Sequence, residues 1–218
     1  MAAASTVVTG ANNGCVGPAT PRTNVPPEPD PLADRAGPTF SGCDYNNTHV
    51  NGKVSTLGPG VYCGGITVTG STVTFLPGTY VLNGGGLNVS SNSILNGTNV
   101  TFYNTGDNKS FSPFSISGGT TGSLSAPTSG PMEGMLFFQD RTITAKATNT
   151  LSGGTGLTYE GAFYFPTSAL TFSGGSISTA NYTIIVADTI NITGQSVINA
   201  DFSSLQNGDP IKRVALAE

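Results

Sequence analysis

The sequence predicts an all-β protein: a right-handed parallel β-helix of about six to seven coils with a Pro-rich N-terminal strap. Two observations support this prediction most strongly. The composition is rich in small polar residues and poor in charge, and a short frame of apolar and hydroxyl residues recurs along the chain at coil-length spacing. A third observation, an apolar run before several copies of the frame, adds one more strand to each coil.

Small polar residues dominate the composition. The 218 residues include 22 Ser, 30 Thr, 18 Asn and 30 Gly, whereas charged residues make up only 9% against about 25% in an ordinary globular domain. This composition argues against a helical bundle. The net charge of −4 lacks the basic excess that a nucleic-acid binder needs, so no nucleic-acid partner is expected. Short strands joined by Gly, Ser, Thr and Asn turns fit best.

The frame has eight positions: apolar, any, apolar, Ser/Thr, Gly/Ser, any, Ser/Thr, apolar. Four clear copies cover residues 66–73, 87–94, 170–177 and 190–197, and two weaker copies start at Phe114 and Ile143. Strand side chains alternate between faces, so positions 1 and 3 point to the same interior. Positions 4–7 then form a turn, and position 8 places another apolar residue inside.

The spacing of the frame predicts the solenoid. Apolar runs at 60–62, 78–82, 134–138, 161–165 and 182–186 supply a third strand, and three short strands in about 20 residues fit one coil of a β-helix. Right-handed crossovers are expected between parallel strands. An antiparallel sandwich is the competing architecture, but a fixed frame has no reason to recur in it. Insertions at 105–113, 125–133 and 147–159 lengthen the middle coils and are expected to project from one side.

The first 40 residues differ from the rest, because half of the 14 prolines fall between Pro18 and Pro38. We expect residues 1–40 to form an extended strap or linker, followed by one β-helix domain over 41–218. The chain contains no apolar run of about 18 residues, so no transmembrane segment is predicted.

The three cysteines are Cys15, Cys43 and Cys63. One disulfide is the simplest interpretation, with Cys43–Cys63 as the preferred pair and Cys15 left over; three buried free thiols are the alternative. There is no CxxC pair, and His49, in a polar stretch expected to be a solvated loop, is the single histidine. Neither a metal site nor a cofactor is therefore expected. A disulfide favours an extracellular or periplasmic location.

Several motifs together suggest a family. They are LGPGVYCGGI at 57–66, LPGTYV at 76–81, DPLA at 30–33, LSAP at 124–127, GMLFFQD at 134–140 and VALAE at 214–218. As a set they resemble the C-terminal region of bacterial TadG-like proteins of the Tad/Flp pilus-assembly system, over residues 30–218. The resemblance implies an exported module of the bacterial envelope, with envelope or pilus proteins as partners. It implies no established activity.

Carboxylates are the candidate catalytic groups, since β-helices often carry polysaccharide hydrolases and lyases. Asp140 and Asp188 follow apolar runs at equivalent coil positions, with Thr167 equivalent on the coil between them, and Arg141 adjoins Asp140. Two coil steps give about 9.6 Å between their backbones, near the upper end of the about 6.5–9.5 Å of inverting glycosidases. The competing interpretation is that Asp140 caps a turn and pairs with Arg141, while Asp188 bonds turn amides.

The outward residues of the frame strands form the second candidate site. They are Thr67, Thr69, Asn88, Ser90, Ser115, Ser117, Thr171, Ser173, Asn191 and Thr193. Stacked coils would array these hydroxyl and amide groups about 4.8 Å apart. Such an array would bind glycans or ice, or simply keep a β-helix solvated.

These features favour an exported, non-catalytic structural or adhesive module of the bacterial cell surface, with glycans or pilus proteins as partners. The alternative is a polysaccharide hydrolase or lyase that uses Asp140 and Asp188. Ice binding through the hydroxyl array is a third possibility.

Overall fold

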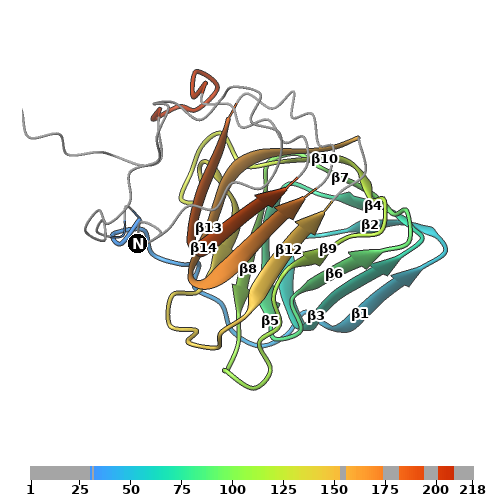
Figure 1. Cartoon of the computed structure of the whole chain (residues 1–218). Coiled ribbons are helices and arrows are strands. Elements are labelled where there is room, and N and C mark those ends of the chain that lie inside the picture. Colours follow the sequence, from blue (N-terminus) through green and yellow to red (C-terminus); the bar gives the residue numbers. More distant parts are fainter. Residues whose placement is uncertain (1–29, 31, 153–155, 174–181, 194–200, 209–218) are drawn as a thin grey trace, which may run out of the picture.

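The computed structural model describes residues 30, 32–152, 156–173, 182–193 and 201–208. These residues form fourteen strands and no α-helix, and every strand pairing is parallel. The strands stack into a solenoid of about six turns (Figure 1), which confirms the predicted parallel β-helix. The described residues contain no helix long and apolar enough to cross a membrane.

Each coil has three sides, and the side built by the recurring frame is called the frame face here. Its strands are β1 (Tyr45–Asn51), the end of β3 (Gly60–Thr69), β6 (Leu87–Ser90), β9 (Ser115–Ile116), β12 (Thr148–Ser152) and the ends of β13 (Leu157–Ser173) and β14 (Thr183–Thr193). Ile66 pairs with Leu87, and Leu170 pairs with Ile190, so the clear copies of the frame stack in register.

The next side along the chain, called the second face, carries five short strand segments. They are β2 (Val54–Leu57), β4 (Thr72–Phe75), β7 (Ile94–Gly97), β10 (Thr121–Ser125) and the first residues of β13. Val73 pairs with Leu95, and Leu57 pairs with Phe75, so apolar side chains line the inner side of this face.

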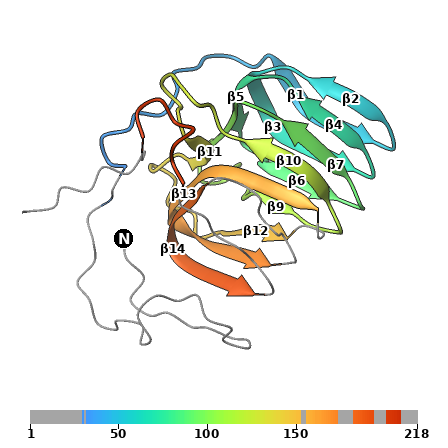
Figure 2. The ribbon, with the colours of Figure 1, turned by 90° about the horizontal axis from the view of Figure 1, so that it is seen from above.

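The remaining side, called the strap face, carries the apolar runs. Its strands are the start of β3, β5 (Gly78–Asn83), β8 (Val100–Thr105), β11 (Met135–Gln139), the middle of β13 and the start of β14. β13 continues through all three faces, so one uninterrupted strand forms both corners of this coil. Figure 2 shows β1 and β2 at one end of the stack and β14 at the other.

Aromatic rings fill the middle of the coils. Tyr62, Tyr80, Phe102 and Phe137 follow one another through the stack at centroid distances of 5.3–5.8 Å. Rings at this spacing add about 0.5–1.5 kcal/mol per pair to the free energy gained from burial. Phe137 is fully buried in the coil interior, whereas Ile185 in β14 is partly buried.

The strap face is apolar on its outer side too. Val61, Val81, Tyr103, Phe138 and Tyr164 point outward there and form a second buried cluster. Leu32 of the predicted strap joins this cluster with 3% of its surface exposed. The described part of the strap therefore lies on the domain; residues 1–29, with Cys15, fall outside the described residues.

The weak frame copy predicted at Ile143 is wrong. The register pairs Asn149 with Leu170 and Leu151 with Ile116, so this coil's copy begins at Asn149. Asn149 is fully buried at an apolar position; its Oδ1 accepts a hydrogen bond from Phe114 N at 3.0 Å. The third insertion therefore lies at 140–147, between β11 and β12, and not at 147–159.

The second copy of the frame is also shifted at its last position. Ile94 is 39% exposed, while Leu95 is fully buried and pairs with Val73. The turn before them holds one additional residue, and Ser91 and Asn92 take positive φ of 61° and 54° to accommodate it. The last positions of the third and fourth copies, at 177 and 197, lie outside the described residues.

Candidate functional site

The outward side chains of the frame face form two straight columns, called the ladder here. The first column is His49, Thr67, Asn88, Ser115, Thr150, Thr171 and Asn191. The second is Asn51, Thr69, Ser90, Ser117, Ser152, Ser173 and Thr193. The ladder contains all ten predicted residues and four more. It carries no acidic side chain.

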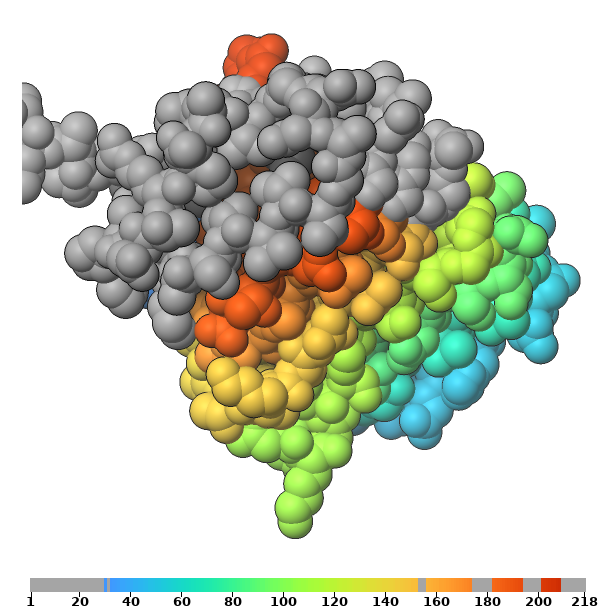
Figure 3. Space-filling view, viewed as in Figure 1, coloured from blue at the N-terminus to red at the C-terminus, as the bar shows by residue number. Residues whose placement is uncertain are grey.

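Two ladder side chains bond to the protein itself. Asn88 Nδ2 donates to Gly85 O at 3.0 Å, and Ser117 Oγ lies 3.5 Å from Val89 O. Within the described part of the chain the other ladder side chains make no hydrogen bond. In Figure 3 this face runs across the front of the molecule, and no described segment lies over it. Apart from those two bonds, no described residue occupies the hydroxyl and amide groups of the ladder.

His49, Asn51, Thr150 and Ser152 are the ladder residues that sequence reasoning missed. The expected loop at His49 is wrong, because this residue lies in β1 with its side chain exposed. The alternation was readable in the letters THVN at 48–51 and NTLS at 149–152. Thr48 and Asn149 occupy the first position of the frame, where an apolar residue is expected. The copies of the frame that begin at these two residues were therefore not recognised in the sequence.

The second face carries another outward column, which sequence reasoning also missed. It consists of Thr56, Thr74, Asn96, Ser123 and Thr158. The alternation Val73-Thr74-Phe75 was the available signal. Beside this column stand apolar residues, since Val54 is 81% exposed. The second face is thus less uniformly polar than the frame face.

Asp140 and Asp188 occupy equivalent coil positions, although Asp140 directly follows β11 and Asp188 lies within β14. Phe138 pairs with Tyr164, which pairs with Val186, and each aspartate lies two residues beyond its strand residue. The register between β13 and β14 is interrupted after the pair Phe165–Ala187 and resumes at the pair Ala169–Thr189. Three residues of β13, including Thr167, the predicted equivalent, therefore lie opposite Asp188.

Both oxygens of the Asp140 carboxylate accept hydrogen bonds from neighbouring residues. Oδ1 accepts hydrogen bonds from Thr142 N at 2.9 Å and Thr142 Oγ1 at 2.8 Å, and Oδ2 accepts one from Thr105 Oγ1 at 2.8 Å. Burial acts to raise the pKa of Asp140, but the hydrogen bonds outweigh it and hold the pKa below its ordinary value. A general acid needs the opposite shift.

Asp188 has a different neighbour. Its Oδ2 lies 3.5 Å from Lys146 Nζ, and the lysine side chain is 82% exposed. An ion pair this exposed is worth about 0–1 kcal/mol. The two carboxylates therefore share a coil position but differ in their surroundings.

Arg141 does not pair with Asp140; it holds the strap instead. Its guanidinium donates to Leu32 O at 2.7 Å and to Arg35 O at 3.1 Å. Nε lies 3.9 Å from an Asp30 carboxylate oxygen and 3.3 Å from Tyr164 Oη, which itself donates to Asp30. Burial and the Asp30 carboxylate raise the pKa of Tyr164 to about 12, so this hydroxyl keeps its proton.

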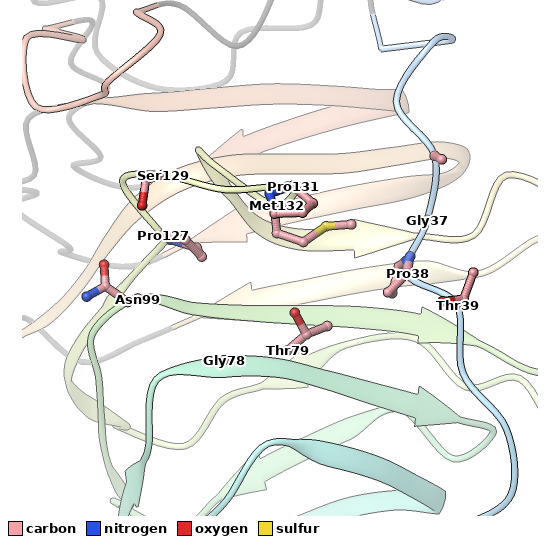
Figure 4. A pocket seen from close by; sticks show the side chains of 11 residues that line it. Gly37, Pro38, Thr39, Gly78, Thr79, Asn99, Pro127, Ser129, Pro131 and Met132 are labelled. Atoms are coloured by element: carbon pink, nitrogen blue, oxygen red, sulfur yellow. The ribbon is translucent and has the colours of Figure 1, made fainter.

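A pocket of about 560 Å³ opens beside the strap (Figure 4). Its lining residues are Ala36, Gly37, Pro38, Thr39, Gly78, Thr79, Asn99, Pro127, Ser129, Pro131 and Met132. None of them is ionisable, and neither Asp140 nor Asp188 reaches it. The described lining of the pocket therefore supplies no acid or base for hydrolysis.

The Sγ atoms of Cys43 and Cys63 are joined in a disulfide that links Cys43 to β3. Cys43 lies shortly after the predicted end of the strap at residue 40, and below the strap is taken to extend to Cys43. Among the described residues, no group of three or more His, Cys, Asp or Glu side chains is placed to hold a metal ion. Comparison of the chain with family models, curated proteins and solved structures finds no match.

Proposed function

We propose that this chain is an exported, non-catalytic adhesive module of the bacterial cell surface that binds glycans through the ladder. The observation that carries the proposal is the unbroken register of outward side chains over seven stacked strands of a face that no described segment covers; apart from His49 they are hydroxyls and amides. Sugar hydroxyls both donate and accept hydrogen bonds, as Ser, Thr and Asn side chains do.

Three further features support this proposal. The ladder lacks acidic groups, so it does not repel acidic or neutral polysaccharides. The Cys43–Cys63 disulfide suits an oxidising compartment outside the cytosol. The association with envelope or Tad/Flp-type pilus proteins rests on the motif resemblance alone.

Polysaccharide cleavage by Asp140 and Asp188 has weaker support. Cleavage with inversion needs one carboxylic acid of raised pKa and one free carboxylate facing the same sugar. Asp140 has three hydrogen-bond donors on its oxygens and a lowered pKa, and Asp188 lies beside Lys146. The pocket beside the strap is lined by neither of these two carboxylates.

A glycan array tests the proposal with matched variants. Thr150→Tyr places a large ring in the middle of the ladder and is expected to weaken binding to the retained glycans at least about tenfold, the effect of losing about 1.4 kcal/mol. Thr74→Tyr makes the same kind of change on the second face and is expected to leave binding intact. Equal loss in both variants, or no binding at all, contradicts a ladder site.

Two other assays separate the alternatives. Release of reducing ends or unsaturated sugars from a polysaccharide panel, lost in Asp140→Asn, would establish cleavage in place of adhesion. Ice binding would show as thermal hysteresis that disappears in Thr171→Tyr, because a flat array at about 4.8 Å spacing also presents ordered hydroxyls to ice. Adhesion predicts neither signal.

A further inference from the structure

The end of the solenoid formed by the first coil is an open sheet edge. Among the described residues, β1 pairs only with β3, and β2 pairs only with β4. Figures 1 and 2 both show these two strands at the extreme end of the stack, with no described segment beyond them. An unprotected strand edge of this kind is a template for pairing with another chain.

Apolar side chains are exposed at this end. Tyr45 stacks on Tyr62 with ring centroids 4.5 Å apart and planes inclined by 20°, and Tyr45 is 41% exposed. It is the last ring of the aromatic stack that continues through Tyr80 into the core. Val54, at the start of β2, is 81% exposed. Repeat proteins need capping at their ends, and this end shows large apolar groups instead.

The backbone of β1 has unused hydrogen-bonding groups at this edge. Val50 pairs with Val68, and Gly52 N donates to Thr69 O at 3.0 Å, so the even-numbered residues bond inward to β3. In a parallel ladder the alternate residues direct both backbone groups to the other side. His49 and Asn51 therefore present their N–H and C=O groups at the open edge.

Two charges flank this strand, one before it and one after it. Asp44 accepts a hydrogen bond from Val61 N at 2.8 Å, and Lys53 is exposed at the turn into β2. Within the described part of the chain neither of them forms an ion pair. A strand with an acid at one end and a base at the other is complementary to an antiparallel copy of itself.

We propose that two copies of this chain associate through their open ends, with β1 pairing antiparallel to β1 across a two-fold axis. A pairing centred on His49 sets the outward backbone groups of the two strands against each other. It places Lys53 of one copy opposite Tyr45 and next to Asp44 of the other, and symmetry repeats this contact. A lysine over a tyrosine ring and beside a carboxylate is favourable on both counts.

The strap leaves this end free for a partner. From Cys43 it runs along the strap face toward Arg141 and Tyr164, which belong to much later coils. Its described residues therefore cover the side of the solenoid and not its first coil.

The molar mass in solution tests the proposal. Light scattering behind size exclusion is expected to give twice the 22.1 kDa of one chain at high protein concentration, with dissociation on dilution and at high salt. A monomer at every concentration, or an open-ended series of larger species, overturns it. A zero-length carboxyl–amine cross-link between Asp44 and Lys53 of different copies would locate the contact directly.

Two variants separate pairing from folding. His49→Pro removes an outward N–H while the inward bonds of β1 stay in place, so it is expected to abolish the dimer with little loss of thermal stability. Lys53→Glu is expected to weaken dimerisation about tenfold by facing Asp44 with a like charge, whereas Lys109→Glu, an equal change in an exposed loop, leaves it unchanged. A dimer that survives His49→Pro and Lys53→Glu contradicts the proposed edge.

Discussion

At the scale of single residues, glycines form the corner between the strap face and the frame face. A Cβ on Gly85 would lie 2.0 Å from Gly64 O, and one on Gly65 would lie 2.3 Å from Gly86 O. Gly85 also has a φ of 73°, which L-residues with side chains rarely adopt. Successive coils therefore approach each other here by backbone alone.

The variant Gly85→Ala is expected to lower the free energy of unfolding by about 2–4 kcal/mol, because it combines a backbone clash with a left-handed conformation. Gly52→Ala is the control: its φ is 63°, but no atom lies within 4 Å of the added Cβ. It should cost about 1 kcal/mol from backbone strain alone. Urea unfolding measures both, and equal losses would show that close packing of the corner is unimportant.

The Asp140 turn predicts an acid-dependent contribution to stability. A carboxyl whose pKa is lowered by folding stabilises the native state above its ordinary pKa near 3.8, and this stabilisation disappears as the pH falls through the folded value. Asp140→Asn should be less stable than the parent chain at pH 7, and the difference should shrink below about pH 4. A difference that is independent of pH between 7 and 3 would contradict this role.

Buried polar residues mark the limit of what the sequence can reveal at this scale. Asn149 stands at an apolar frame position because its amide accepts from Phe114 N and donates to Ala169 O at 3.3 Å, bridging neighbouring coils. Gln139 is fully buried as well, and its Nε2 donates to Thr167 Oγ1 at 2.7 Å. Such polar residues interrupt the apolar pattern of the sequence although they occupy regular buried positions of the coil. The pattern alone therefore does not reveal them.

At the scale of elements, the described part of the strap is fastened at both of its ends. The Cys43–Cys63 disulfide fixes one end covalently. At the other end Arg141 reaches the carbonyls of Leu32 and Arg35, and Arg35 in turn donates to Glu133 O at 2.9 Å. The outer side of the strap face is apolar, so the strap replaces water over it.

Arg141→Met is expected to lower the free energy of unfolding by about 1–3 kcal/mol, since it leaves the strap carbonyls without their charged donor. Amide hydrogen exchange in residues 32–36 should accelerate, while exchange in β8 stays slow. Lys146→Met is the control, because its ion pair with Asp188 is exposed and worth little. Unchanged exchange in the strap would show that apolar contacts alone hold it.

At the scale of the whole molecule, one continuous core joins the coils. The ring of Phe137 contacts those of Phe102, Phe114, Tyr159 and Phe163 at centroid distances of 4.8–5.8 Å. These rings come from all three faces of the coils. Each coil is therefore stabilised by its neighbours and not by itself.

Phe137→Ala is expected to cost about 3–5 kcal/mol of stability, the range for removing a buried aromatic ring. Because the other stacked rings and the parallel strand pairings still join neighbouring coils, tertiary signals from the early and late coils should still be lost together in thermal unfolding. Val54→Ala, on the exposed end, should change the melting temperature little. Two separate unfolding transitions in Phe137→Ala would show that this ring couples otherwise independent halves.

The sequence predicted the architecture because a coil repeats its inward and outward positions, and four copies of the frame kept them over their first four positions. It predicted ten ladder residues for the same reason. It misplaced the coil at Asn149 and the insertion at 140–147, because a polar residue replaced the apolar marker. The anchoring of the strap by Arg141 was not predictable, since it joins residues 106 and 109 positions apart.

The two unequal fastenings of the strap give it a direction under mechanical load. A pull on its N-terminal side would first break the hydrogen bonds of Arg141 and then peel Leu32 from the outer cluster, one contact at a time. Extension would stop at the Cys43 disulfide after about 14 residues, or roughly 45–50 Å of released chain. The coils would bear the force only after the strap was fully extended. Because the broken contacts can re-form, the strap would act as a short, reversible extension between the applied force and the β-helix.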